Sequence, residues 1–302
     1  MSDWKTELKE LAPGVYAYIQ AKGTWFVSNA GLIVGQEDAI VVDSLSNEEM
    51  VQAFIAEVKK VTDKPISFLI NTHGHGDHIW TNHFFPQAKV ICQSKSREMT
   101  LEDMKMPPKS YEPMFPGLSF DGAKATLQDI VFEKELVLYQ GEREIRLVYN
   151  GPAHTTGDVF VHLPQENIVF CGDLLFYQCT PLALMGYVSG WIDTIDLLAG
   201  LDAKAYVSGH GPVTDKAGLL ESQEYLIHIR AEARTRFDAG MDAFEAAKDI
   251  DLEKFAAWAD SARIAANVER LYSEFRGEKP GAPLDVMAIL PKMMSLMQGG
   301  YK

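Results

Sequence analysis

One eight-residue segment constrains this chain more than any other. Three of the eight histidines in the 302-residue sequence fall within positions 73–78, where the segment from Asn71 to His78 reads NTHGHGDH. It follows the compact apolar run Ile66–Ile70, which predicts a buried strand, and precedes a helix-like stretch that begins at Ile79. We therefore expect a loop at the C-terminal end of a strand, where layered α/β proteins place their functional sites.

The residue types and spacing in this loop are those of metal ligands. On an extended backbone His73 and His75 project to the same side, and the glycines beside them allow tight turns. Asp77 and His78 are adjacent and point apart, so they can serve a second centre next to the first. Neutral imidazoles with a carboxylate are the ligand set of zinc or a similar divalent transition metal. Surface histidines in a turn would leave four ligand-type residues in one loop unexplained.

Three further candidate ligands follow along the chain. His154, Asp173 and His210 each stand after an apolar run, and each has a glycine or proline nearby that allows close backbone approach. Taken singly, each is more typical of a turn or of a satisfied buried polar group. As a set ordered after the histidine-rich loop, they are predicted to complete a metal site.

Strand patterns alternate with helical patterns over the first two-thirds of the chain, which indicates a layered α/β fold. Short apolar runs between turn residues predict strands at Val15–Gln20, Gly31–Val34, Ala39–Val42, Ile66–Ile70, Lys89–Cys92, Val159–Leu163, Ile168–Cys171 and Ala205–Val207. Hairpin strands are predicted at Ile130–Val137 and at Leu138–Val148, the latter around Gln140-Gly141-Glu142. Helical spacing predicts helices at Asn47–Val61, Lys216–Ala239, Asp251–Arg276 and Pro283–Gln298. Since strand signals vanish after about Asp215, we expect a catalytic domain at 1–215 and a helical C-terminal extension at 216–302.

The ordered set of histidines and aspartates resembles the metallo-β-lactamase-fold metal-dependent hydrolases over roughly residues 10–215. The resemblance implies an αββα sandwich that holds two metal ions in a central cleft. It implies that His73, His75 and His154 bind one ion, that Asp77, His78 and His210 bind the other, and that Asp173 bridges both. An aspartate rather than a cysteine at 173 resembles the dinuclear glyoxalase-II, lactonase and thioesterase branch. Further segments are similar to polyketide thioesterase/cyclase members, namely Gly14–Tyr18, Ser28–Gly31, Thr180–Leu184 and Ala266–Arg270.

The chemistry implied by this resemblance is hydrolysis. Two zinc ions per chain, with iron or manganese as other options, would lower the pKa of a bridging water, and the resulting hydroxide would attack a carbonyl. Asp77, as a ligand beside it, is the candidate catalytic group that takes or passes the proton. The apolar stretch Leu174–Ile192 and the methionine- and proline-rich segment Ser94–Gln128, a candidate lid, favour an ester or thioester with a bulky apolar acyl group. The alternatives are lactonase or β-lactamase activity at the same site, or a mono-iron persulfide (sulfur) dioxygenase.

Several other residues have candidate roles around the site. Asp43, at the end of a predicted strand, is expected to orient a residue of the metal loop, with a simple acid near a helix start as the alternative. Trp25 and Phe26 lie on a turn where the fold carries a flap, and Phe176 and Tyr177 are expected to wall the substrate pocket. Structural roles are expected for His83, His162, His228, Cys171, Cys179, Trp258, Arg263, Asn267 and Arg270.

The net charge and the cysteine content indicate which binding partners and which cellular compartment to expect. The formal net charge of −14 disfavours general binding to nucleic acid or to anionic membranes, so a small-molecule substrate is expected. Three cysteines and a charged N-terminal segment without an apolar core favour the cytoplasm. Proline, glycine and polar residues interrupt the uncharged stretch Leu174–Ile192, which is therefore expected to be a buried loop rather than a membrane helix. The methionine-rich segment Met287–Met297 is a candidate homodimer contact.

Overall fold

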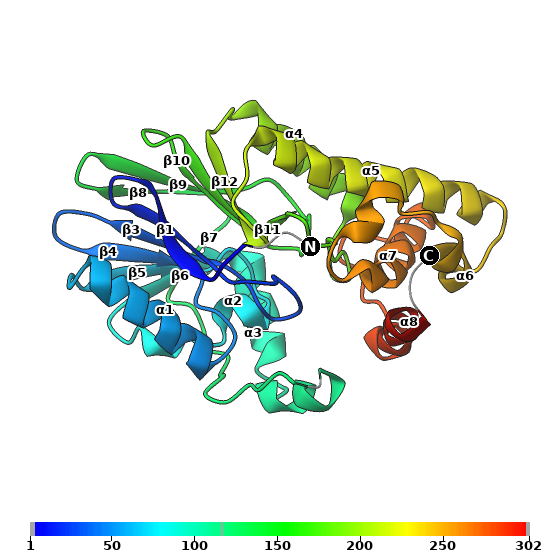
Figure 1. Cartoon of the computed structure of the whole chain (residues 1–302), viewed down its shortest axis with the longest axis horizontal. Helices are drawn as coiled ribbons and strands as arrows, with labels where there is room; N and C mark the ends of the chain where they lie inside the picture. The colour runs from blue at the N-terminus through cyan, green and yellow to red at the C-terminus, as the bar shows by residue number, and fades with distance from the viewer. Residues whose placement is uncertain (1–3, 116, 300–302) are drawn as a thin grey trace.

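Two β-sheets face each other in this protein, and helices cover the outer side of each sheet (Figure 1). The computed structural model describes residues 4–115 and 117–299. One sheet has seven strands in the order β1-β2-β3-β4-β5-β6-β7, antiparallel from β1 to β4 and parallel from β4 to β7. Its strands are β1 (Glu7–Ala12), β2 (Val15–Ile19), β3 (Ala30–Val34), β4 (Ala39–Val42), β5 (Ile66–Ile70), β6 (Lys89–Gln93) and β7 (Ile130–Phe132).

The second sheet has five strands in the order β12-β11-β10-β9-β8. The pair β11 and β12 is parallel, and the other pairs are antiparallel. Its strands are β8 (Glu135–Gln140), β9 (Arg143–Tyr149), β10 (Val159–Leu163), β11 (Ile168–Phe176) and β12 (Ala205–His210). β4 and β5 are parallel neighbours, and so are β11 and β12. The carboxyl ends of the two strands in each pair therefore lie at the same edge of their sheet, where the loops that follow them can meet.

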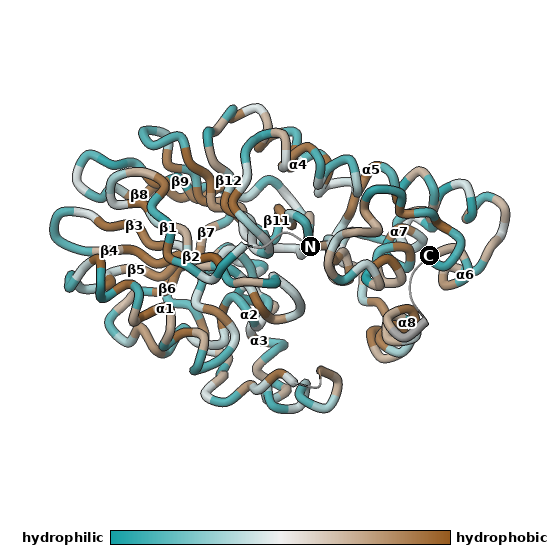
Figure 2. Tube along the Cα trace, viewed as in Figure 1, coloured by the Kyte–Doolittle hydropathy of each residue, from teal (hydrophilic) through white to brown (hydrophobic). Residues whose placement is uncertain are grey.

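The space between the sheets is filled by apolar side chains from both of them. Val42 and Ile70 of the first sheet belong to the same buried cluster as Leu147, Val161 and Phe170 of the second. Every residue of β4 and of β11 is buried, as expected for strands covered on both faces. The hydrophobic residues accordingly concentrate on the strands, and polar residues on the loops and outer helix surfaces (Figure 2).

Helix α1 (Glu48–Val61) covers the seven-stranded sheet. The Asn47 side chain accepts a hydrogen bond from the Met50 N–H and so caps the first turn. Val51, Phe54 and Val58 then lie on one face of the helix and are buried against the sheet. This amphipathic pattern explains why the sequence predicted the helix correctly.

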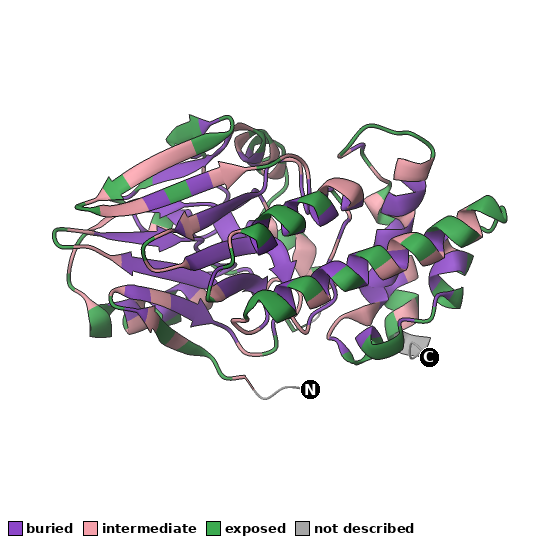
Figure 3. Ribbon diagram, turned by 90° about the horizontal axis from the view of Figure 1, so that it is seen from above, coloured by how far each residue is buried: buried purple, intermediate pink, exposed green. Residues whose placement is uncertain are grey.

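Helices α4 (Val188–Gly200) and α5 (Lys216–Asp238) cover the five-stranded sheet, and their exposed faces are turned outward (Figure 3). The αββα order of layers that the sequence predicted is therefore present. Beyond α5, the chain is helical as expected. Its elements are α6 (Ala243–Asp249), two short 3-10 turns (Glu253–Ala257 and Ser261–Arg263), α7 (Ile264–Phe275) and α8 (Val286–Gly299). Within the described residues, no helix is both long and apolar enough to cross a membrane.

The helical extension shares its core with the sandwich. One hydrophobic cluster includes Val169 of β11, Trp191 of α4, Leu226 of α5 and Leu271 of α7. Helix α5 begins at Lys216, where the sequence placed the start of the extension. The division into two domains stays a prediction, because the apolar core runs across it without a break.

Short helices and turns complete the connections near the site. They are α2 (Gly76–Ile79), the 3-10 turn Asn82–Phe84, α3 (Ser94–Asp103) and the 3-10 segment Pro108–Met114. The candidate lid Ser94–Gln128 therefore begins as a regular helix. Its later part packs with Trp80 and Phe26 in a separate small apolar cluster.

Two sequence predictions near the site are corrected. The stretch Leu174–Ile192 is not a continuous loop, because β11 runs to Phe176 and α4 begins at Val188. Continuous burial removes the alternation that would have marked the end of the strand. The stretch Ile130–Val137 is not one strand either, because β7 pairs with β6 while β8 pairs with β9 in the other sheet.

The predicted helix Asp251–Arg276 is wrong in its first half. Asp260 has a left-handed backbone with φ of 60°, which an α-helix of L-residues cannot continue. The regular helix α7 therefore begins only at Ile264. The edge strand β1 and the helices α3, α4 and α6 were not expected from the sequence. The patterns of β1 and α6 are too brief to recognise, whereas α3 lies in the candidate lid and α4 begins inside the expected loop.

The packing of α1 makes a testable prediction. Replacing the fully buried Phe54 by Ala should lower the free energy of unfolding by about 3–5 kcal/mol, because the large side chain leaves a cavity under the helix. Gln52→Ala changes an exposed position of the same helix and should stay within about 0.5 kcal/mol. Urea denaturation of both variants measures this, and equal midpoints would contradict the packing role of Phe54.

Candidate metal centre

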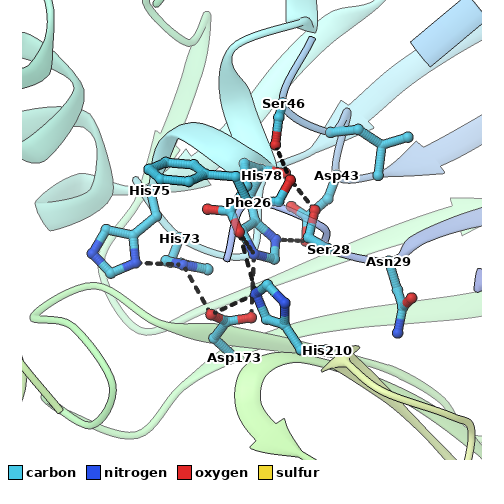
Figure 4. Close-up of polar contacts among 12 residues, drawn as sticks. Phe26, Ser28, Asn29, Asp43, Ser46, His73, His75, His78, Asp173 and His210 are labelled. Carbon is cyan, nitrogen blue, oxygen red and sulfur yellow. Dashed lines mark hydrogen bonds and ion pairs between the residues drawn. The ribbon is translucent and has the colours of Figure 1, made fainter. Parts of the chain in front are cut away.

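The structure brings together all seven side chains that the sequence predicted as ligands. They come from loops, strands and the short helix α2 at one edge of the sandwich, and all of them are buried except His75, which is half-buried. His73 and His75 follow β5, Asp77 and His78 lie in α2, His154 lies between β9 and β10, Asp173 lies in β11, and His210 ends β12. Figure 4 shows the convergence of five of them, His73, His75, His78, Asp173 and His210.

The first group of candidate ligands consists of His73, His75, His154 and Asp173. His75 Nδ1 lies 3.1 Å from His73 Nε2 and 2.9 Å from His154 Nε2. Asp173 Oδ2 lies 3.2 Å from His154 Nε2 and 3.8 Å from His73 Nε2. Three ring nitrogens and a carboxylate oxygen therefore point at one small volume.

The second group consists of Asp77, His78 and His210. Asp77 Oδ2 lies 3.2 Å from His210 Nε2 and 3.7 Å from His78 Nε2. Asp173 reaches this group as well, because its Oδ1 lies 3.2 Å from His78 Nε2 and its Oδ2 lies 3.5 Å from His210 Nε2. Asp173 thus stands between the two groups and contacts both.

The donor set fits divalent cations. His78 Nε2 and Asp173 Oδ1 lie 3.2 Å apart and are buried, yet neither makes a hydrogen bond, although unsatisfied buried polar atoms are costly. Zinc–nitrogen bonds of about 2.0–2.1 Å in a tetrahedron place neighbouring ligand atoms roughly 3.3 Å apart. The spacings in both groups are close to this value, so the arrangement is suited to binding metal ions.

Hydrogen bonds on the far side of the rings hold several of these histidines. His78 Nδ1 lies 2.8 Å from Asp43 Oδ2, and Asp43 also accepts hydrogen bonds from the Thr72 N–H and hydroxyl. His154 Nδ1 donates to the Leu182 carbonyl at 2.7 Å, and His210 Nδ1 donates to a backbone carbonyl, that of residue 23, at 3.2 Å. In the neutral form of each ring the proton sits on Nδ1, so Nε2 can present a lone pair to a bound cation.

Two glycines of the second sheet allow this close packing. Gly172 has φ of 51°, and a Cβ there would collide with the Thr72 side chain. A Cβ at Gly209 would collide with Asp173 Oδ1. The register of β11 against β12 is irregular on both sides of Gly172, so the strand can turn the Asp173 carboxylate towards the histidines.

Burial and nearby charges shift the pKa values of histidines in the two groups in opposite directions. Burial lowers the pKa of His73 well below its usual value and that of His154 to about 3, so both rings are neutral at pH 7. Burial also opposes protonation of His210, but Asp173 and Asp77 outweigh it and raise the pKa of His210 to about 9. In the ion-free protein a proton on His210 therefore compensates nearby carboxylates, and a bound cation would supply that charge instead.

The two carboxylates are held in the ionised form. Burial raises the pKa of Asp77, but the neighbouring His78 and His210 outweigh this effect and lower it to about 2. The same balance holds the pKa of Asp173 well below its usual range, with His210 and His78 as the main cations. Both side chains are therefore available as anionic ligands at neutral pH.

The predicted pocket residues Phe176 and Tyr177 face different directions. The Phe176 ring is buried and lies nearly parallel to the His210 ring, with centroids 5.0 Å apart and 5.5 Å from His154. It therefore packs beneath ligand rings. Tyr177 lies against Gly218 of α5 and lines a surface hollow of about 620 Å³ together with Lys254, and none of the seven candidate ligands lines that hollow.

The predicted flap residues Trp25 and Phe26 contact the candidate lid. The Phe26 ring stacks on Trp80 at 5.5 Å and contacts Phe115 at 5.0 Å. Trp25 contacts Phe115 at 5.3 Å, and the Arg263 guanidinium lies 4.6 Å from its ring. A substrate contact by either residue stays a prediction. The contacts themselves tie the flap to the segment 94–128 and to the helical extension.

The residues with expected structural roles lie outside both ligand groups. Cys171 and Cys179 are buried free thiols, and burial raises the pKa of Cys179 to about 12. Sequence reasoning missed the carbonyls of residues 23 and 182, because a backbone acceptor has no side-chain signature. It also missed Thr72, whose position directly before the first histidine of the loop could have suggested a supporting role.

Two proteins of known activity are similar in sequence. The chain is 30% identical over 152 residues to the 2,4-dinitroanisole O-demethylase subunit alpha of Nocardioides sp. (strain JS1661), over 49% of this chain and 41% of that subunit. It is 23% identical over 225 residues to the metallo-beta-lactamase type 2 of Elizabethkingia meningoseptica, over 71% of this chain and 82% of the relative. The chain thus spans about two-fifths of the demethylase subunit and most of the lactamase.

Solved structures match the fold over most of the chain. A metallo-beta-lactamase from Pontibacter korlensis superposes with a TM-score of 0.61 at 20% identity, covering 74% of this chain and 99% of that one. The inverting sec-alkylsulfatase Pisa1 from Pseudomonas sp. superposes with a TM-score of 0.71 at 15% identity, covering 93% of this chain and 52% of that one. The second superposition therefore includes helical parts beyond the sandwich.

The glyoxalase-II-like branch and the polyketide cyclase likeness stay predictions, since neither relative belongs to them by name. The family itself is established by a model of the metallo-beta-lactamase superfamily, which matches residues 23–210, more than half of the chain. The same range contains all seven candidate ligands. The chain belongs to the metallo-beta-lactamase superfamily.

Proposed function

We propose that this protein is a hydrolase that uses two divalent cations, in the first instance zinc, to cleave an ester or thioester with a bulky apolar acyl group. The observation that carries the proposal is the position of Asp173, which contacts histidines of both ligand groups. A carboxylate shared in this way is suited to holding two cations side by side. Such a pair would activate a water molecule for attack and polarise the carbonyl of the substrate.

The protein's own residues have distinct parts in this chemistry. The neutral rings of His73 and His154 supply lone pairs without first losing a proton. Asp77 is the carboxylate on which we place the proton of the attacking water, because its Oδ2 lies at the second group and it is ionised. Asp43 keeps the His78 ring oriented through the contact at 2.8 Å.

The surroundings of the site support an apolar substrate. Met185 is 44% exposed, and its sulfur lies 3.4 Å from His75 Nε2. On another side, Trp25 and Phe26 meet the aromatic side chain of Phe115 from the candidate lid. Methionine and aromatic side chains adapt to irregular apolar groups, so these positions suit a bulky acyl part.

A second candidate is ring opening of a β-lactam, which the alignment with the lactamase over 82% of that relative favours. It needs the same attack on a carbonyl carbon, as does a lactone. The likeness to an alkylsulfatase and to an ether demethylase adds alkyl sulfates and aryl methyl ethers to the substrates worth assaying.

A cytoplasmic location, a small-molecule substrate and a homodimer contact at Met287–Met297 also remain part of the proposal.

The first prediction from this proposal concerns Asp173. Asp173→Ala should lower zinc content from two ions per chain and bring turnover below detection, because both ligand groups lose their shared carboxylate. Elemental analysis is combined with assays on carboxylic esters, acyl thioesters, lactones, β-lactams, alkyl sulfates and aryl ethers. Asp193→Asn, at an exposed carboxylate of α4, is the matched control and should be unchanged.

Retained turnover in folded Asp173→Ala protein would contradict the bridging role. Wild-type protein that carries about one iron per chain and consumes oxygen with persulfides would instead favour the dioxygenase alternative. Activity on thioesters at least tenfold above that on β-lactams would favour the first candidate over the second.

The second prediction concerns the hydrogen bond that orients His78. Asp43→Asn keeps the size of the side chain but removes its charge, so His78 is held less firmly. We expect zinc affinity to fall by about 10–100-fold, as for other outer partners of metal-binding histidines. Competition with a chromophoric chelator measures the affinity, and an unchanged value would show that Asp43 serves only to hold Thr72.

The third prediction concerns removal of the ions. Exhaustive chelation should lower the melting temperature, and zinc alone should restore it, because an ion that binds only the folded state stabilises it. At a free zinc concentration 100 times the dissociation constant, this stabilisation is about 2.7 kcal/mol per site. Differential scanning calorimetry with and without chelator tests it, and identical curves would contradict metal binding by this cluster.

A further inference from the structure

The segment between β11 and α4 lies along one face of α7 and is hydrogen-bonded to it turn after turn. Arg263, directly before α7, donates to the Thr180 carbonyl at 2.8 Å. Asn267 donates through Nδ2 to the Pro181 carbonyl at 2.9 Å and accepts from the Ala183 N–H at 2.8 Å. The helix thus holds a stretch of backbone that has no regular structure of its own.

The same face continues along the rest of α7. Arg270 donates to the Leu184 carbonyl at 2.8 Å, and Glu274 accepts from the Ser189 hydroxyl at 2.9 Å and from two N–H groups at the start of α4. The positions 263, 267, 270 and 274 recur at helical spacing, so their side chains lie on one face. Arg263, Asn267 and Arg270 are each at most 2% exposed.

This segment carries the acceptor that orients a candidate ligand. The Leu182 carbonyl accepts from His154 Nδ1 at 2.7 Å. Leu182 lies between Pro181 and Ala183, and both of these residues are bonded to the one amide of Asn267. Asn267 therefore accepts from the N–H of the same peptide group whose carbonyl His154 uses, and it donates to the carbonyl of the peptide group before it.

The Asn267 amide uses its oxygen and both of its N–H donors, which fixes its own orientation. Its oxygen accepts from Ala183, and its nitrogen donates to Pro181 and to the Tyr225 hydroxyl at 2.9 Å. Turning the amide over would place its NH₂ group against the Ala183 N–H and its oxygen against the Pro181 carbonyl. A buried side chain with all three contacts met is a rigid support rather than a filler of space.

We propose that Asn267 is a positioning residue for His154, acting through the Leu182 carbonyl from a helix outside the sandwich. The inference rests on the proposed function in one respect, that His154 binds a metal ion. Because His154 Nδ1 donates to the Leu182 carbonyl, the position of that carbonyl sets the orientation of the ring. The ring then points its Nε2 at His75 and Asp173. Loss of the support should loosen this ring without removing any ligand.

The test compares two substitutions in α7. Asn267→Leu keeps a similar volume but removes the hydrogen bonds to the segment, whereas Leu271→Ala removes buried apolar volume from the same helix and touches no polar contact. Both should lower the melting temperature. Only Asn267→Leu should weaken zinc binding, by about 10–100-fold in one of the two binding steps. It should also change the visible spectrum of the cobalt-substituted protein.

A double-mutant cycle with His154→Ala identifies the path of the effect. If Asn267 acts through His154, then Asn267→Leu should not weaken zinc binding further once His154 is absent. Additive losses would overturn the proposal, as would equal zinc affinities for Asn267→Leu and Leu271→Ala. Should Asn267→Leu fail to fold, Asn267→Asp replaces it, since it keeps the acceptor for Ala183 and loses the donor to Pro181.

The outcome also separates this inference from the proposed function. Wild-type protein that binds no zinc would contradict the hydrolase proposal. Wild-type protein that binds zinc and turns over ester or thioester, together with unchanged binding in Asn267→Leu, would leave the hydrolase proposal standing and reject the positioning role alone.

Discussion

The Asp173 carboxylate is held between histidines of two groups, and this contact determines what the surrounding structure must do. An ionised carboxylate 3% exposed needs compensation by positive charge, and the neighbouring rings supply it only in part, since His73 and His154 are neutral at pH 7. His210 carries a proton at pH 7 in the ion-free protein, and bound metal ions would supply more positive charge than this proton does. The cost of burial is therefore what makes this edge of the sandwich a site for cations.

The two sheets meet this requirement from opposite sides. The seven-stranded sheet presents the histidine-rich loop after β5, and the five-stranded sheet presents Asp173 and His210 from the parallel pair β11 and β12. Gly172 lets the two sheets approach at Thr72 without a Cβ in between, and Gly209 leaves room for the Asp173 carboxylate within the second sheet. The apolar core between the sheets thus does more than stabilise the fold, because its thickness sets the distance between ligands on different sheets.

How far each feature could be predicted from the sequence depends on whether its residues lie close together along the chain. The residues His73 to His78 lie within one loop, so their spacing alone indicated metal binding. His154 and His210 needed the order of the whole set, because neither has a local signature. The carbonyl of Leu182 and the support from Asn267 depend on the path of the chain in space, which no pattern along the sequence contains. The break at Asp260 was missed for a similar reason, since apolar spacing continues across it.

The supports of the histidines are of two physical kinds, and they respond differently to substitution. His78 is held by the Asp43 side chain, so a single exchange at that position alters it directly. His154 and His210 are held by backbone carbonyls, which no exchange at residue 182 or 23 removes. Their geometry can change only through whatever fixes those loops, and for His154 that is the polar face of α7. A helical extension that shares its core with the sandwich therefore belongs to the metal centre in a physical sense, although it contributes no ligand to either group among the described residues.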